Sequence, residues 1–191
     1  MDHIKTHHQD QFRKETLKLY NQRISAAIGI GIILIPLFSL LDYVIVKPFF
    51  SLFFIYRVTC SALLLLLFYF HRTETGRRGP FTITILVDFI ICMMISSMVV
   101  HLGGYSSSYY VGILLILVIT TALLPLDTIQ SLTIGVMLFL LYCIPIILYS
   151  QPTEKNLPIF FNNCFFFISF ILTSIVKCHE DTKARKREFN L

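Results

Sequence analysis

Six apolar segments, separated by short polar or charged stretches, dominate this chain of 191 residues. They cover residues 24–46, 49–70, 81–102, 110–126, 129–149 and 157–176. A helix needs about 20 apolar residues to cross the hydrocarbon core of a bilayer. Lipid offers no hydrogen bonds to the backbone, so apolar segments of this length form helices. The sequence therefore predicts an all-α membrane protein, a bundle of six transmembrane helices that has the lipid bilayer as its first partner.

The overall composition supports the membrane class and gives little support to catalysis. Hydrophobic residues make up 55% of the chain and charged residues only 14%, whereas soluble domains carry about 25% charged residues. The sequence has no GxSxG, no HExxH and no glycine-rich phosphate loop, which are the motifs that enzymes of the common classes carry. We therefore expect no catalytic residue, no metal site and no cofactor in this chain.

The basic residues are distributed unevenly between the two sides of the predicted bundle. Of the 16 lysines and arginines, all but Lys47, Arg57 and Lys155 lie before the first segment, between the second and third, or after the sixth. Cytoplasmic loops of membrane proteins carry an excess of Lys and Arg. Both termini are therefore predicted to be cytoplasmic. The net charge of +5 then reflects topology, and no nucleic-acid partner is expected.

The N-terminal segment, residues 1–23, combines basic and apolar side chains. Phe12, Leu19, Tyr20 and Ile24 fall close to one helical face, and the basic residues lie elsewhere. This pattern predicts a basic amphipathic helix that lies on the membrane surface before the first span. The alternative is a helical extension in solvent.

The last segment, residues 177–191, is rich in charged residues that favour helices and contains neither proline nor glycine. It is predicted to continue the sixth span of the transmembrane domain, residues 24–176, into the cytoplasm without a break. We interpret it as the start of a signalling helix that leads to an output domain beyond residue 191. The alternative is a frayed polar tail.

Two charged residues, Arg57 and Asp88, lie deep inside predicted spans. A charge in the hydrocarbon core costs at least a few kcal/mol, so a partner or a water-filled site is expected. At 1.5 Å per residue the two side chains lie at depths that differ by only about 6 Å. We therefore predict an Arg57–Asp88 ion pair between the second and third helices. It acts either as a static clamp or as a switch or part of a ligand or proton path.

Polar residues also gather in the outer third of the predicted bundle. The predicted lining of an outward-opening pocket is Asp42, Tyr43, His101, Gly103, Gly104, Tyr105, Ser107, Tyr109, Tyr110, Asn162 and Asn163. Mixed apolar and hydrogen-bonding walls are typical of small-ligand sites. The expected ligand is a small amphiphilic molecule. The alternative is that these polar groups only connect helices.

Two local features make further predictions. Asp127 follows Pro125 and Leu126 at the end of the fourth segment, and aspartate is a preferred N-cap residue, so we expect it to cap the fifth helix. Cys143 and Cys164 lie at similar depths on adjacent predicted helices. They are interpreted as small apolar core residues, with redox pairing as the alternative.

Four of these features together resemble the six-helix membrane input domains of bacterial sensor histidine kinases, and similar modules precede some class III adenylate cyclases. They are the basic lead-in from Arg13 to Arg23, the arginine in the second span (Arg57), the stretch Gly103-Gly104-Tyr105-Ser106-Ser107-Ser108-Tyr109-Tyr110, and the charged exit of the sixth span. The family has Ser-Pro-Tyr-Tyr where this chain has Ser107-Ser108-Tyr109-Tyr110.

The resemblance implies a sensory, signal-transducing domain of a two-component system in the bacterial cytoplasmic membrane. It implies a homodimer in which shifts of the last helix are passed to a cytoplasmic output domain. It places no catalytic residue in this chain. Two alternative functions stay open: a small membrane transporter or channel, and a passive dimerising membrane anchor.

Overall fold

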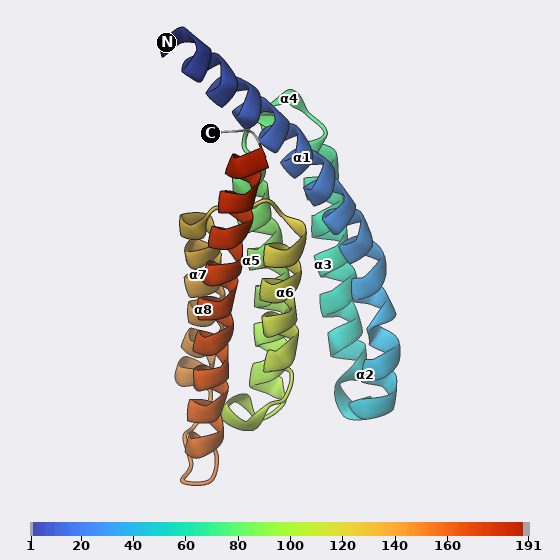
Figure 1. Cartoon of the computed structure of the whole chain (residues 1–191). Coiled ribbons are helices and arrows are strands. Elements are labelled where there is room, and N and C mark those ends of the chain that lie inside the picture. The colour runs from blue at the N-terminus through green and yellow to red at the C-terminus, as the bar shows by residue number, and fades with distance from the viewer. Residues whose placement is uncertain (1, 189–191) are drawn as a thin grey trace.

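The computed structural model of the chain describes residues 2–188, with side chains placed at residue 11 and from residue 13 onward. The described residues form α-helices and two short 3₁₀ helices and contain no strand. The elements are α1 (Asp2–Leu37), α2 (Ser39–Ile45), η1 (Lys47–Phe49), α3 (Phe50–His71), α4 (Glu74–Arg78), α5 (Pro80–His101), η2 (Gly104–Ser106), α6 (Tyr110–Leu123), α7 (Thr128–Tyr149) and α8 (Leu157–Glu188). The predicted all-α fold class is confirmed (Figure 1).

Five stretches of the described chain are long and apolar enough to cross a membrane. They are Arg13–Ile45, Lys47–His71, Pro80–His101, Thr128–Tyr149 and Leu157–Glu188. A sixth apolar helix, α6, has only 14 residues and therefore measures about 21 Å. The chain is a helical, multi-pass membrane protein.

The exposure of the side chains supports this assignment. Large apolar residues point outward, for example Val44, Ile129 and Leu148 with 72%, 77% and 69% of their surface exposed. Charged and polar residues lie inside instead, among them Asp42 at 1% and Asp88 at 2%. Because the surrounding lipid is as apolar as leucine, a membrane bundle gains nothing by burying leucine and must shield its polar groups.

Helix α5 lies at the centre of the bundle. It contacts α3, α6 and α7, and it also touches α1. Around it α1 packs on α3, and α8 packs on both α6 and α7. The N-terminal half of α1, α4 and the C-terminal end of α8 lie at the same end of the bundle (Figure 1). The α1–α3 pair and the α6–α8 group are thus joined mainly through α5.

Local sequence explains where the helices begin and end. Proline lacks an N–H and disrupts a helix interior, and α1 ends one residue after Pro36. Pro80 stands in the first turn of α5, where its missing N–H costs nothing. The predicted N-cap of α7 is confirmed: the Asp127 side chain accepts from the backbone of Gln130, and the Gln130 side chain accepts from the backbone N–H of Asp127.

The N-terminal end of the chain departs from the predicted helix bounds, whereas the C-terminal end follows them. The basic segment does not form a helix of its own, because α1 runs without a break from Asp2 into the first apolar segment and ends at Leu37. Tyr20 and Ile24 are buried against the bundle, and the predicted Phe12 side chain lies outside the described residues. Helix α8 runs unbroken to Glu188, and residues 189–191 of the expected signalling helix lie outside the described part of the chain.

The packing of α7 on α8 can be tested through a pair of cysteines. The sulfur atoms of Cys143 on α7 and Cys164 on α8 are 4.0 Å apart. We expect copper phenanthroline to oxidise the intact protein to one intrachain disulfide, with two electrons and two protons passing from these thiols to the oxidant. Mass spectrometry of unreduced peptides identifies the linked pair.

Two variants serve as controls for this experiment. Cys143→Ser should abolish the cross-link, whereas Cys92→Ser should leave it intact because Cys92 lies on α5. A disulfide between Cys164 and any other cysteine would contradict the packing.

Candidate functional site

A buried ion pair joins α2 to α3. The Nε atom of Arg57 donates to Oδ2 of Asp42 at 2.5 Å, and a second nitrogen, Nη2, donates to Oδ1 at 3.0 Å. The third nitrogen of the guanidinium, Nη1, donates to the carbonyl of Ile35 at 3.4 Å. The guanidinium also lies 5.7 Å from the centre of the Phe38 ring. The arginine is therefore neutralised by a two-pronged contact, which is the strongest geometry for this kind of pair.

The predicted Arg57–Asp88 pair is wrong. Asp42 takes the place of Asp88 because the α2–η1–α3 hairpin turns α2 back along α3 and directs Asp42 into the bundle. Depth along a helix axis is set by residue number, but the direction of a side chain around that axis is set by packing. Arg57 and Asp88 lie at similar predicted depths and point toward different neighbours.

Asp88 occupies a separate polar position between α5 and α6. Its Oδ1 atom accepts a hydrogen bond from the Thr120 hydroxyl at 2.9 Å. Its other oxygen, Oδ2, has no hydrogen-bond partner among the described residues. One turn earlier on α5, Thr84 shares a 3.0 Å hydrogen bond with the Tyr20 hydroxyl of α1. Asp88 is thus a buried acid held by a single hydroxyl and by no described cation.

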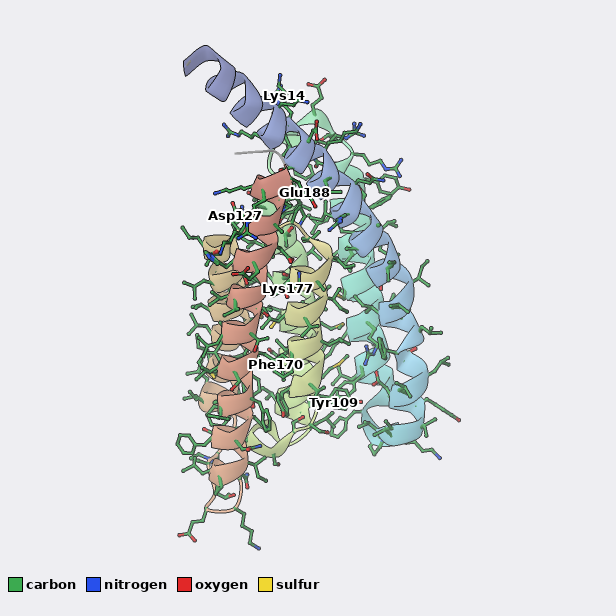
Figure 2. The ribbon with its side chains drawn as sticks, viewed as in Figure 1. Lys14, Tyr109, Asp127, Phe170, Lys177 and Glu188 are labelled. Carbon is green, nitrogen blue, oxygen red and sulfur yellow. The ribbon has the colours of Figure 1, made fainter. Side chains whose placement is uncertain are left out.

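Tyr109 connects the Arg57–Asp42 pair to the start of α6. Its hydroxyl donates to Oδ1 of Asp42 at 2.9 Å. Burial and the neighbouring carboxylate raise the pKa of Tyr109 to about 12, so the phenol is protonated and donates at neutral pH. Tyr109 immediately precedes Tyr110, the first residue of α6. It lies between α6 and the α2–α3 pair (Figure 2).

His101, the last residue of α5, lies against aromatic residues of η1 and α3. Its ring lies 6.2–6.5 Å, centre to centre, from the rings of Phe49, Phe53 and Tyr56. One of these, Phe53, also packs against Tyr109, with ring centres 6.1 Å apart. The Nδ1 atom of His101 lies 2.8 Å from the carbonyl oxygen of Ser97. Of the predicted pocket residues, Asp42, His101 and Tyr109 therefore form one cluster on the side of α2 and α3.

A second cluster contains three other predicted residues. Tyr105 packs edge-on against Phe160 with ring centres 5.0 Å apart. Tyr110 lies 5.9 Å from Tyr142, whose hydroxyl accepts from Asn163 at 3.4 Å. This cluster joins η2 and the start of α6 to α7 and α8. The tyrosines thus fill the interior with ring-to-ring contacts.

The remaining predicted residues shape the turn or face outward. Gly103 and Gly104 have φ angles of +91° and +50°, a region that glycine enters easily. The Ser107 hydroxyl accepts from the backbone N–H of Tyr109 at 3.3 Å. Tyr43 and Asn162 are exposed. The structure therefore divides the predicted pocket residues between two clusters and the outer surface.

The other end of α6 is held by cations that the sequence reading did not single out. The Lys177 ammonium of α8 donates to the carbonyl of Thr121 at 2.6 Å. Arg185 and Thr182, further along α8, donate to the carbonyl of Leu126 at 3.3 and 3.4 Å. The last carbonyls of a helix lack internal partners and carry partial negative charge, so cations stabilise them.

Helix α1 contributes to the same end of α6. The Nη1 atom of Arg23 donates to the carbonyl of Leu123, the last residue of α6, at 3.1 Å. We call these contacts of Arg23, Lys177, Thr182 and Arg185 with α6 and the loop after it the carbonyl clamp. The signal in the sequence that points to it is the shortness of the fourth apolar segment, because the terminal carbonyls of a helix too short to cross the bilayer need polar partners.

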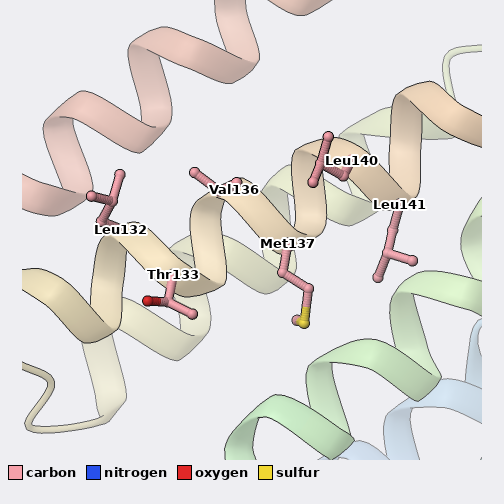
Figure 3. A pocket seen from close by; sticks show the side chains of 6 residues that line it. All are labelled: Leu132, Thr133, Val136, Met137, Leu140 and Leu141. Atoms are coloured by element: carbon pink, nitrogen blue, oxygen red, sulfur yellow. The ribbon is translucent and has the colours of Figure 1, made fainter.

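Hollows in the surface lie away from both clusters. One of about 550 Å³ runs along α7 and is lined by Leu132, Thr133, Val136, Met137, Leu140 and Leu141 (Figure 3). Its one polar side chain is a threonine, so it offers lipid an apolar surface. Within the described residues no group of three His, Cys, Asp or Glu side chains is placed to hold a metal ion.

No protein-family model matches the chain, and no curated protein or solved structure matches it. The fold and the site therefore define its class on their own. The chain is a helical membrane protein with a buried Arg–Asp–Tyr network near one end of its short helix α6 and a clamp of cations on carbonyl groups at the other.

The ion pair makes a prediction that separates Asp42 from Asp88. Asp42→Asn leaves Arg57 buried without a counter-charge, and we expect a loss of about 3–5 kcal/mol of stability. Asp88→Asn retains an oxygen that accepts from Thr120, and we expect a loss below about 1 kcal/mol. Unfolding by sodium dodecyl sulfate in bicelles, followed by circular dichroism, measures both values.

A double variant tests whether the loss of stability in Asp42→Asn comes from the unpaired charge of Arg57. Asp42→Leu combined with Arg57→Met removes both charges and should recover most of the stability that Asp42→Asn loses. A larger loss for Asp88→Asn than for Asp42→Asn would contradict the assignment of the pair.

Proposed function

We propose that this chain is a membrane-embedded sensory input domain that transmits a signal through α8 to a cytoplasmic output domain. In this proposal α6 is the fourth of six spans, and both termini lie in the cytoplasm of a bacterial cell. The output domain is a histidine kinase or, as a second choice, an adenylate cyclase, and the chain works as a homodimer. The resemblance of the sequence to such input domains and the distribution of its basic residues support these assignments.

The single observation that carries the proposal is that both ends of α6 are tied to other helices by polar contacts. At one end Tyr109 donates to Asp42, which pairs with Arg57 of α3. At the other end Lys177 and Arg185 of α8 hold carbonyls of α6 and of the loop that follows it. Tyr109 and Lys177 lie toward opposite ends of the bundle (Figure 2). Helix α6 therefore links the buried ion pair to the charged part of α8.

This arrangement suggests how a signal crosses the membrane. A helix of 14 residues moves as a rigid body, because its backbone hydrogen bonds resist stretching and packed helices shift between discrete arrangements. An amphiphilic ligand or a change in the membrane that alters the bond between Tyr109 and Asp42 then displaces α6. Because Lys177 is hydrogen-bonded to a carbonyl of α6, it moves together with α6. The shift then continues along the unbroken helix α8.

The proposal predicts that a substitution at Tyr109 changes the hydrogen exchange of α8. The bond from Tyr109 to the carboxylate is worth about 1.5–3 kcal/mol, and Tyr109→Phe removes only the hydroxyl. We expect faster amide hydrogen exchange both in the 121–126 segment and in residues 177–188 of the protein in nanodiscs. Mass spectrometry of the exchanged peptides measures it.

Tyr43→Phe is the matched control, because Tyr43 lies next to Asp42 but has 58% of its surface exposed and no described hydrogen bond. It should leave exchange in α8 unchanged. A passive anchor predicts that Tyr109→Phe changes exchange only around residues 42 and 109, and this result would refute the proposal.

A further inference from the structure

A second hollow lies between α1 and α6, next to the carbonyl clamp. It measures about 320 Å³ and is lined by Arg23, Ala26, Ala27, Ile30, Ala122 and Leu123. This volume is at the lower end of the range for small-ligand sites, about 300–1,000 Å³. The hollow exists because alanines stand on both facing helices. At Gly29, on the same part of α1, a side chain would meet no atom within 4 Å.

The hollow is polar at one end and apolar along its length. Arg23 supplies a guanidinium that forms no ion pair with any described carboxylate. Of its three nitrogens, Nη1 alone has a described hydrogen-bond partner, the carbonyl of Leu123. Three alanines and the side chains of Ile30 and Leu123, which are 52% and 40% exposed, form the apolar part. The hollow thus opens sideways toward lipid.

We propose that this hollow is a binding site for one anionic phospholipid. The phosphate binds the free N–H groups of Arg23, and one acyl chain lies along Ala26 and Ile30. A phospholipid fits because it carries an anionic phosphate and a hydrocarbon chain in one molecule. The phosphate matches the guanidinium of Arg23, and the chain matches the apolar wall that begins one turn further along α1. The site lies at the basic end of the bundle, where exposed Lys18 and Arg77 add to the attraction of anionic headgroups.

The consequence of this binding rests on the proposed function. The phosphate competes with the Leu123 carbonyl for the same guanidinium, and a charged oxygen is the stronger acceptor. When the lipid binds, Arg23 releases the end of α6, and α8 alone holds that end through Lys177. The anionic lipid content of the membrane thus sets how firmly α6 is fixed to α1.

The test uses the whole chain in vesicles of phosphatidylcholine that contain phosphatidylglycerol with a photoactivatable acyl chain. We expect cross-links to the segments 23–30 and 122–123. Arg23→Gln should lower the yield there about fivefold, the factor expected for losing one basic residue near an anionic surface. Arg78→Gln should leave the yield unchanged, because this exposed arginine at the same end does not line the hollow and already pairs with Glu74.

Further variants and a second lipid decide the outcome. Ala26→Leu fills the hollow without changing charge and should also lower the cross-linking, with helix content checked by circular dichroism. Equal cross-linking by photoactivatable phosphatidylcholine, or full yield in Arg23→Gln, would overturn the lipid site. Hydrogen exchange at 177–188 is measured on the same samples: lost cross-linking with unchanged exchange supports the lipid site and counts only against the coupling to α8.

Discussion

The length of α6 is the constraint on which the rest of the structure depends. Its 14 residues span about 21 Å, whereas the hydrocarbon core is about 30 Å thick. In the proposed six-span topology, the carbonyls at its end lie within this core, where lipid cannot satisfy them. Arg23 of α1 and Lys177 of α8 supply the missing hydrogen bonds. Both helices must approach α6 at one end for this reason, and Tyr109 ties the other end to the α2–α3 pair.

The two buried aspartates serve different purposes because their surroundings differ. Asp42 faces a guanidinium and a phenol, which together provide three hydrogen-bond donors to its two oxygens. Asp42 therefore holds α2, α3 and the start of α6 together at one end of the bundle. Asp88 has one hydroxyl and a free oxygen within the described residues. Asp88 therefore connects α5 to α6 through one hydrogen bond and is held by fewer donors than Asp42.

Sequence reasoning predicted the helices well and their side-chain partners poorly, for a physical reason. Helix bounds follow from local features: apolar length, prolines such as Pro36 and Pro80, and the capping Asp127. The partner of Arg57 depends on the rotation of each helix about its axis, which is set by packing between segments that are distant in sequence. Apolar residues cover every face of these spans, so no amphipathic stripe indicates that rotation. The carbonyl clamp was missed because every residue has a backbone carbonyl, so residue types do not reveal the acceptors, and only the shortness of the fourth apolar segment points to them.

The clamp uses carbonyl acceptors, and this choice matters for the proposed movement of α6 and α8. A carbonyl binds a cation more weakly than a carboxylate does, so a contact between cation and carbonyl breaks at less cost than the Arg57–Asp42 pair. Arg185 has two buried nitrogens, Nε and NH1, that have no partner within residues 2–188. The present position of α8 therefore leaves hydrogen-bonding capacity unused. In the proposed mechanism, a shift of α8 that gives these groups partners offsets the bonds that it breaks at Leu126, which keeps the free-energy difference between the two positions of α8 small.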